Sequence, residues 1–126
     1  MKEPLVGRDS ELRELSALLA SEARIVTLRG PIGVGKSCLA REATRELQSV
    51  VTVDLHAESA PEALDDLEWD TELVVLDGAD GVLGALRARV RAWLDRAPGL
   101  TLLVTAREAL GLPGEGVLEV APLPVP

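Results

Sequence analysis

The chain has 126 residues, a formal net charge of −8 and a single cysteine, Cys38. This length accommodates one domain with one core, and a lone cysteine excludes both an internal disulfide and a zinc site built from several thiolates. No apolar run approaches the roughly 20 residues that a membrane helix needs, and the start MKEPLVGRDSE lacks a signal peptide's apolar stretch, so we expect a cytoplasmic protein without membrane contact.

Helical and strand patterns alternate along the chain. An apolar stripe that follows a capping residue at Asp9 or Ser10 predicts a helix to about Ala20. The stretch ELVVLD is almost continuously apolar, which is typical of a strand covered on both faces. This alternation predicts a layered α/β fold. Strands are expected at 24–30, 50–55, 72–77, 100–106 and 116–121, and further helices from the glycine-rich loop to about 48, at 59–67, and from 83 to a stop at 97–99.

A glycine-rich loop joins the first strand to the next helix. Residues 30–37, GPIGVGKS, match the pattern G-x-x-x-x-G-K-[ST] in the required strand, loop and helix context. Its glycines let successive amide N–H groups face inward at the positive end of the helix, where they bind phosphate. Lys36 would contact the β and γ phosphates, and the Ser37 hydroxyl can bind Mg²⁺. The predicted cofactor-binding residues of this loop are Gly30, Gly33, Val34, Gly35, Lys36, Ser37 and Cys38.

A dinucleotide-binding loop is the nearest alternative for this segment. Gly33 and Gly35 begin the pattern G-x-G, but Cys38 stands where the third glycine is required. We therefore reject this alternative. The Cys38 thiol lies in the first turn of the predicted helix, where packing is expected rather than reactivity.

An aspartate ends the third predicted strand. Asp77 closes LVVLD in the form of a Walker B acid, whose carboxylate would bind Mg²⁺ through water or together with Ser37. The alternative is a turn-forming aspartate, because the sequence DGAD is typical of a turn. Ligands bind at the carboxyl ends of strands in parallel sheets, where Gly30, Asp77 and residues 105–107 all fall.

Two further charged residues follow at this edge of the predicted sheet. Asp80 could orient an attacking water molecule, or it could cap the helix that begins GVLGAL. Arg107 could stabilise charge on a terminal phosphate, or it could be an ordinary surface arginine. The predicted catalytic residues are Lys36, Asp77, Asp80 and Arg107.

Acidic residues dominate the middle of the chain. No Lys or Arg lies between Arg45 and Arg87, whereas eleven Asp and Glu residues do. Such a segment repels the phosphate backbone of DNA or RNA, so we expect no direct nucleic acid contact there. The run forms either a solvated face or a docking face for a basic partner.

Several segments together resemble a known family: LVGRDSELRELSALL, GPIGVGKSCLARE, LVVLDGAD, APGLTLLVTAREALGLPGE and PLPVP. Over nearly its whole length the chain is similar to the nucleotide-binding domain of STAND-class signalling ATPases, the AP-ATPase or NB-ARC-like domain of bacterial LuxR-type and SARP-type regulators. The resemblance is weakest at 50–71. Its most specific parts are Gly-Arg-x-x-Glu near the start and TAREALGLPGE.

The resemblance implies ATP or ADP with Mg²⁺ as ligands. It places Val6, Gly7 and Arg8 against the adenine base and makes Arg107 the sensor of the terminal phosphate. Similar proteins switch between a closed ADP form and an open ATP form, which requires different affinities for two conformations. Two features depart from the family. Gly78 stands where Asn or Asp is frequent, and the usual helical and winged-helix domains are missing, so we expect a fragment or a minimal relative.

These patterns predict a three-layer α/β P-loop NTPase domain at 1–121, followed by the start of a linker at 122–126. Its central, mainly parallel five-stranded sheet is expected in the order 5-1-4-3-2. The predicted function is an ATP/ADP-dependent signalling switch with slow, Mg²⁺-dependent hydrolysis, which would contact other domains or proteins of a signalling assembly. A non-hydrolysing nucleotide-binding interaction module is the alternative. A small-molecule kinase is disfavoured because no segment supplies an acceptor pocket or an arginine-bearing lid.

Overall fold

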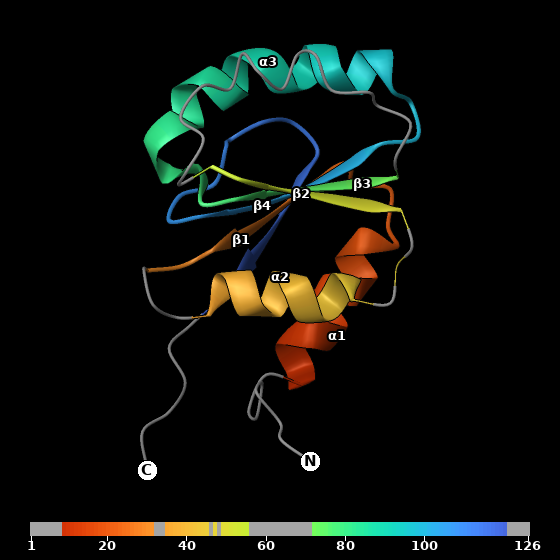
Figure 1. The fold of residues 1–126 in the computed structure, drawn as a ribbon, viewed down its shortest axis with the longest axis vertical. Coiled ribbons are helices and arrows are strands. Elements are labelled where there is room, and N and C mark those ends of the chain that lie inside the picture. The colour runs from red at the N-terminus through yellow and green to blue at the C-terminus, as the bar shows by residue number, and fades with distance from the viewer. Residues whose placement is uncertain (1–8, 32–34, 46, 48, 56–71, 121–126) are drawn as a thin grey trace.

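The computed structural model describes residues 9–31, 35–45, 47, 49–55 and 72–120, and the structural statements below concern these residues. A five-stranded parallel sheet forms the middle layer, with α3 over one face and α1 and α2 over the other (Figure 1). The strands are β1 (Ile25–Arg29), β2 (Val50–Asp54), β3 (Leu73–Asp77), β4 (Thr101–Ala106) and β5 (Glu115–Glu119). The helices are α1 (Asp9–Leu19), α2 (Lys36–Thr44), α3 (Leu83–Arg96) and the short 3-10 helix η2 (Ala79–Val82).

The strand order is β2-β3-β4-β1-β5, and every neighbouring pair is parallel. Read from β5 to β2, this is the predicted order 5-1-4-3-2, so the predicted fold class is confirmed. Since β1 lies between β4 and β5, the loop after β1 leaves the sheet near its centre. The carboxyl ends of β1, β3 and β4 therefore meet at one edge.

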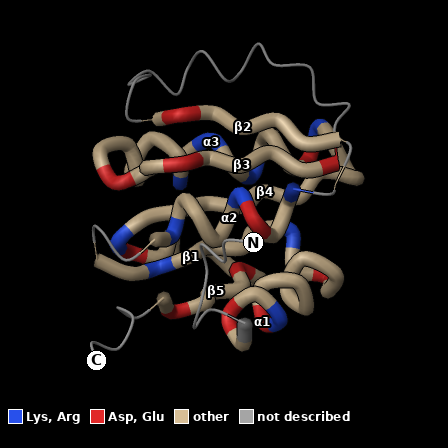
Figure 2. The backbone as a smooth tube through the Cα atoms, turned by 60° about the horizontal axis from the view of Figure 1, so that its bottom comes forward, with Lys and Arg blue, Asp and Glu red and all other residues tan. Residues whose placement is uncertain are grey.

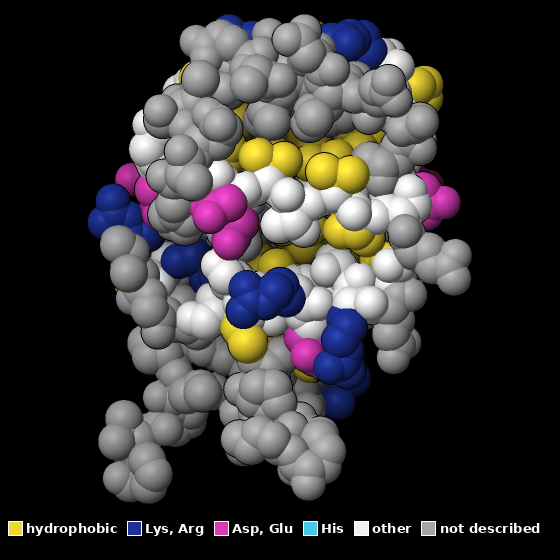
Figure 3. All heavy atoms as spheres, in the orientation of Figure 1, with side chains coloured by type: hydrophobic (Ala, Val, Ile, Leu, Met, Phe, Trp, Pro, Cys, Tyr) yellow, Lys and Arg dark blue, Asp and Glu magenta, His cyan; other side chains and the backbone are white. Residues whose placement is uncertain are grey.

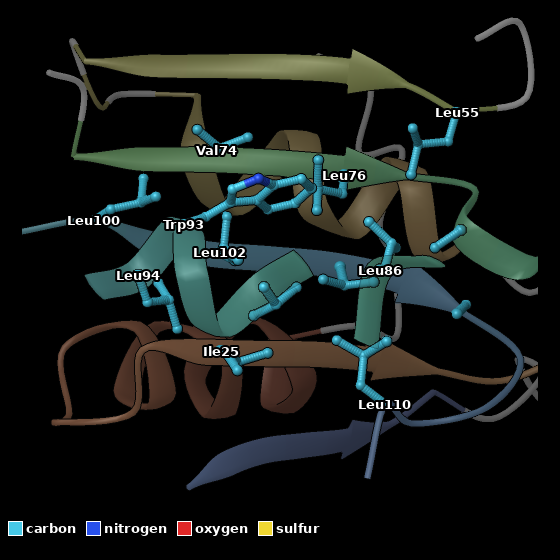
Figure 4. Close-up of a cluster of buried hydrophobic side chains, with 14 of the residues drawn as sticks. Ile25, Leu55, Val74, Leu76, Leu86, Trp93, Leu94, Leu100, Leu102 and Leu110 are labelled. Atoms are coloured by element: carbon cyan, nitrogen blue, oxygen red, sulfur yellow. The ribbon is translucent and has the colours of Figure 1, made fainter. Parts of the chain in front are cut away.

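Two hydrophobic clusters explain why the central strands are continuously apolar. Val74 and Leu76 pack in the cluster under α3, whereas Leu73 and Val75 pack in the cluster under α1 and α2. Successive strand residues point to opposite faces, so both faces of β3 are buried. Trp93 on α3 is only 1% exposed and lies over the sheet in the first cluster (Figure 4).

The observed boundaries differ from the predicted ones mainly at α2. This helix ends at Thr44 rather than near residue 48. The N–H groups of Arg45 and Leu47 bond to carbonyls three residues back, those of Glu42 and Thr44, so the four-residue hydrogen-bond pattern of the α-helix stops here. Leu47 is 51% exposed and does not extend the buried stripe. The helix predicted at 59–67 and the linker predicted at 122–126 lie outside the described residues.

No helix among the described residues is long and apolar enough to cross a membrane. Figure 2 shows acidic residues at neighbouring ends of β2 and β3. These ends carry Asp54 and Asp77, which are paired in the parallel register. Asp77 belongs to the candidate site.

Candidate functional site

The glycine-rich loop is held at both of its described ends. The Gly30 amide donates to the Ala106 carbonyl at 3.2 Å, which ties the loop to the end of β4. Gly35 stands immediately before α2 with φ 91°, a left-handed conformation that favours glycine. Its carbonyl accepts the Leu39 N–H at 2.9 Å and starts the helical hydrogen bonds. Gly33 and Val34 lie outside the described residues.

Lys36 curls back over this loop. Its ammonium donates to the carbonyls of Gly30 and Pro31 at 2.6 and 2.9 Å. Partial burial lowers the pKa of Lys36 below its usual range. Among the nearby charges, Asp80 and Asp77 raise this pKa and Arg107 lowers it further. The side chain is therefore a cation held at the loop by carbonyl acceptors, where an anionic ligand would relieve the cost of burial.

Ser37 and Asp77 meet between α2 and β3. The Ser37 hydroxyl donates to Asp77 Oδ1 at 2.6 Å. Asp77 follows the side-chain alternation of Leu73 and Val75, which face the α1 and α2 layer, so strand geometry aims its carboxylate at the start of α2. The predicted pair of metal-binding side chains is thus brought together by the fold.

Thr105 is a site residue whose function the sequence patterns did not assign. Its hydroxyl donates to Asp77 Oδ1 at 2.7 Å and accepts the Gly78 N–H at 2.8 Å, while the residue is only 1% exposed. Gly78 has φ 81°, so the chain turns sharply just after Asp77. A hydroxyl two residues before the predicted Arg107, on the strand beside β3, was the available signal for this contact.

Asp80 and Arg107 form a second pair at the same edge. Asp80 Oδ1 accepts the Arg107 backbone N–H at 2.6 Å, and Asp80 Oδ2 lies 3.8 Å from Arg107 Nε. The alternative in which Asp80 caps a helix is wrong, because Gly78 precedes η2, Val82 precedes α3, and neither helix start has a side-chain capping bond. The Asp80 carboxylate is instead directed at the start of the loop after β4.

The remaining predicted binding residues are less informative. Cys38 is partly buried in the first turn of α2 with a free thiol, and it packs beside the cluster under α1 and α2. This agrees with the packing interpretation of its side chain. Val6, Gly7 and Arg8 lie outside the described residues.

The donor set at Ser37 and Asp77 fits a magnesium ion that takes most of its ligands from nucleotide and water. A hydroxyl and a carboxylate are hard oxygen donors, which Mg²⁺ prefers, and Mg²⁺ is commonly bound through one or two carboxylates plus substrate phosphates. Within the described ranges, no group of three or more His, Cys, Asp or Glu residues could hold a metal by itself. These residues therefore fit a nucleotide-dependent Mg²⁺ site.

Two hollows differ in their relation to this site. A cavity of about 170 Å³ is lined by Ser37 and Asp77 together with Arg41, Thr52 and other residues of α2, β2 and β3. A larger pocket of about 390 Å³ lies where β3 and β4 begin, at the opposite edge of the sheet, and none of its lining residues belongs to the site. Figure 3 shows hydrophobic side chains exposed between α2 and the strands. Hydroxyl, carboxylate and ammonium groups come together at the carboxyl ends of the strands and not at the larger pocket. We therefore assign the candidate site to the carboxyl ends of the strands.

Comparison with known proteins extends these observations. A family model described as an AAA ATPase domain matches residues 4–120. An uncharacterized protein of Mycobacterium tuberculosis strain H37Rv, Rv0894, is 32% identical over 146 aligned residues, and so is the uncharacterized protein Mb0918 of Mycobacterium bovis. Each alignment covers 94% of this chain but 37% of the relative, so the chain spans about a third of the length of these curated relatives.

Two solved structures share the fold at low sequence identity. A protein proposed to be a primosome component, from Streptococcus pyogenes serotype M3, aligns with a TM-score of 0.53 at 16% identity, over 81% of this chain and 63% of its own. A DNA replication initiation factor aligns with a TM-score of 0.54 at 16% identity, over 91% of this chain and 46% of its own. At this identity the likeness concerns the fold alone.

Proposed function

Because the chain belongs to the AAA ATPase domain family, we propose that it is the ATP- and ADP-binding core of a STAND-type signalling ATPase that switches with the bound nucleotide. The observation that carries this proposal is the convergence of Lys36, Ser37 and Asp77 at the carboxyl edge of the sheet. A flexible cation, a hydroxyl and a carboxylate are the groups that a Mg²⁺-bound triphosphate requires.

The phosphate-binding role is assigned to the loop and the start of α2. Amide groups at the positive end of a helix bind anions, and Gly35 provides the backbone turn that presents them. Lys36 would exchange its two carbonyl acceptors for phosphate oxygens. Gly30, Gly33, Val34, Ser37 and Cys38 complete the proposed binding loop, and Val6, Gly7 and Arg8 are proposed to contact adenine.

The metal role is assigned to Ser37 and Asp77. Asp77 accepts hydrogen bonds from two hydroxyl groups, those of Ser37 and Thr105, so its carboxylate is oriented before any ligand binds. When bound, Mg²⁺ would neutralise charge on the transferring phosphate. Preorganisation of the protein groups lowers the cost of forming that arrangement.

Arg107 is proposed to report which nucleotide is present. It follows β4 directly, at the same edge as the loop, and its charge acts on the pKa of Lys36. A guanidinium there can contact a terminal phosphate that ADP lacks. The difference between ATP and ADP would then pass to the loop after β4, and from there to further domains or protein partners in a cytoplasmic signalling assembly.

A second candidate is a nucleotide-binding interaction module that does not hydrolyse ATP. It is favoured by the sequence after Asp77, where Gly78 occupies the next position and the nearest carboxylate, Asp80, is already bonded to Arg107. Hydrolysis needs a group that orients the attacking water. The two candidates therefore differ in one measurable property: the switch hydrolyses ATP slowly, and the interaction module does not hydrolyse it.

Two measurements test the proposal. Calorimetric titration with ATP, ADP and GTP should show adenine nucleotide binding that is stronger with Mg²⁺ for ATP. A phosphate-release assay should show slow turnover that stops when EDTA is added. Binding without metal-dependent turnover would leave the second candidate, whereas failure to bind any of the three nucleotides would contradict both.

A further inference from the structure

We propose that Asp80 is a positioning residue that acts through Arg107, rather than the base that activates water. The proposal rests on the nucleotide-binding function proposed above. It starts from two contacts made by one carboxylate, which joins the turn after β3 to the first residue after β4.

The stronger of the two contacts is to the backbone. Asp80 Oδ1 accepts the Arg107 N–H at 2.6 Å, within the short range of charge-assisted hydrogen bonds. This bond fixes where the chain leaves β4 and hence where the Arg107 side chain begins. Thr105 supplies a parallel link, because its hydroxyl accepts the Gly78 N–H. The turn that carries Asp80 and the end of β4 are therefore tied twice.

The weaker contact is to the guanidinium. Asp80 Oδ2 and Arg107 Nε lie 3.8 Å apart, and the Arg107 side chain is 58% exposed. Ion pairs of this kind are weak, since water screens the charges. The guanidinium can thus leave Asp80 for a phosphate while the backbone bond stays in place, so Asp80 fixes the base of the side chain and leaves its tip free.

The rest of the loop after β4 is also anchored. The Arg87 guanidinium donates to the Leu110 carbonyl at 2.7 Å, and Glu115 accepts the N–H groups of Leu110 and Gly111 at 2.9 and 2.8 Å. A side chain on a segment held at both ends loses less freedom when it binds. Arg107 therefore lies at the carboxyl ends of the strands on a preorganised segment. The hydrogen bond from its own N–H to Asp80 is the first contact that holds this segment in place.

This arrangement disfavours Asp80 as a general base. Both of its oxygens face Arg107 donors, which compete with an attacking water molecule for the same lone pairs. Asn at this position would keep an oxygen for the Arg107 N–H and lose the ability to take a proton. Ala would lose both, so the pair of substitutions separates positioning from proton transfer.

The experiment compares Asp80→Ala, Asp80→Asn and Arg107→Ala in the full chain, with Asp95→Ala on the exposed face of α3 as the matched control for a lost negative charge. Calorimetry in Mg²⁺ measures the affinity for ADP and for a non-hydrolysable ATP analogue, which prevents turnover. The quantity compared is the affinity for the ATP analogue divided by the affinity for ADP. Asp80→Ala and Arg107→Ala should each lower that ratio about tenfold, the effect of losing one hydrogen bond to a charged group. Asp80→Asn should retain the wild-type ratio, and adding Asp80→Ala to Arg107→Ala should lower it no further.

Amide hydrogen exchange supplies a readout without nucleotide. The Arg107 N–H should exchange about tenfold faster in Asp80→Ala than in wild type, because its acceptor is gone, and at nearly the wild-type rate in Asp80→Asn. If wild type binds neither nucleotide, the proposed function itself fails and the positioning proposal fails with it. If wild type binds both nucleotides and Asp80→Ala leaves the affinity ratio unchanged, only the positioning proposal is overturned. It is overturned likewise if Asp80→Asn keeps the wild-type ratio but abolishes phosphate release as completely as Asp80→Ala does.

Discussion

The Ser37 hydroxyl donates a 2.6 Å hydrogen bond to Asp77 Oδ1, across 40 positions of sequence. Ser37 is the second residue of α2, which follows β1 and the glycine-rich loop, and Asp77 is the last residue of β3, two places from β1 in the sheet order. The contact exists because a parallel sheet gathers the carboxyl ends of its strands at one edge and α2 packs over the same face. It brings two oxygen donors together before a nucleotide arrives.

Replacing Asp77 by Asn tests the metal role. We expect Asp77→Asn to keep binding ADP in EDTA, because the loop and Lys36 are intact, but to lose the gain in ATP affinity that Mg²⁺ gives wild type. A neutral amide is a weaker ligand of Mg²⁺ than the charged carboxylate, so the substitution should weaken that gain about tenfold or more. Calorimetric titrations of ATP with and without Mg²⁺ measure it. An undiminished Mg²⁺ effect would assign the metal to other groups.

Thr105 provides a second test through the residue that orients Asp77. Thr105→Val keeps the shape of the side chain but leaves the Gly78 N–H without its hydroxyl acceptor, which should cost about 1–3 kcal/mol of unfolding free energy. Turnover should fall as well, since Asp77 loses one of its two hydroxyl donors.

Thr105→Ser is the matched control for that substitution because it retains the hydroxyl. Urea denaturation and phosphate release together should place Ser near wild type and Val well below it. Stability and turnover in Thr105→Val equal to those of Thr105→Ser would show that the two hydroxyl hydrogen bonds do not matter at this position.

The sheet order and the site's main pairing could be predicted because local patterns identify the strands and the loop motif, and the P-loop fold that these indicate has a defined strand order. Continuous apolar runs such as LVVLD identify strands covered on both faces, and the loop motif fixes Lys36 and Ser37 at a strand-to-helix junction. Parallel topology then predicts that Asp77 joins them, which the 2.6 Å contact confirms.

The contacts of Asp80 and Thr105 could not be predicted in the same way. Whether Asp80 caps a helix or turns toward the next strand depends on the left-handed turn at Gly78, and the sequence DGAD is compatible with both. Likewise, a hydroxyl inside β4 is one of several polar groups in a strand until the register with β3 is known. Long-range side-chain pairing of this kind is settled by packing rather than by periodicity.

Lys36 is the residue whose removal should most directly affect nucleotide binding. Lys36→Ala is expected to abolish the thermal stabilisation that ADP or ATP gives wild type, because a ligand stabilises a protein only through its affinity for the native state. At a ligand concentration of about 100 times Kd that stabilisation amounts to about 2.7 kcal/mol. Differential scanning fluorimetry measures the shift, with Arg91→Ala on the exposed side of α3 as the control for a lost positive charge. A full shift in Lys36→Ala would contradict the phosphate role.

The lowered pKa of Lys36 predicts how binding depends on pH. Burial disfavours the ammonium form in the free protein, whereas a bound phosphate favours it. ADP affinity should therefore be highest below the pKa of Lys36 in the free protein and should fall as pH rises through it. Because this pKa lies below the usual range of lysine, the fall should begin at a lower pH than for an ordinary lysine.

Lys36→Arg separates the titration of Lys36 from that of any other group in the alkaline range. Arginine stays charged throughout, so the variant should show a nearly flat pH dependence whatever its absolute affinity. Titrations of ADP in EDTA between about pH 7 and pH 10 test the comparison over the range below the usual lysine pKa of about 10.4. Parallel slopes in the two proteins would remove Lys36 as the titrating group.

Arg24 is expected to matter for folding rather than for nucleotide binding. Its guanidinium donates to the carbonyls of Leu94, Ala97 and Leu100 at 3.0, 2.5 and 3.2 Å, and it lies just before β1, at the end of that strand away from the glycine-rich loop. The guanidinium thus joins the last turn of α3 to the segment that leads into β4, and a cation at the end of a helix also favours the helix dipole. Arg24→Ala should therefore lower the free energy of unfolding by about 2–3 kcal/mol, within the range for lost hydrogen bonds to a charged group.

Urea denaturation measures this loss, and two variants show its origin. Arg91→Ala removes an exposed arginine of α3 and should change the free energy of unfolding by no more than about 0.5 kcal/mol. Arg24→Lys keeps the charge but replaces the planar fork by a single ammonium, so it should recover only part of the stability. ADP affinity should remain at the wild-type value in all three folded variants. A loss of affinity in Arg24→Ala without a loss of stability would instead connect the amino end of β1 to the nucleotide site.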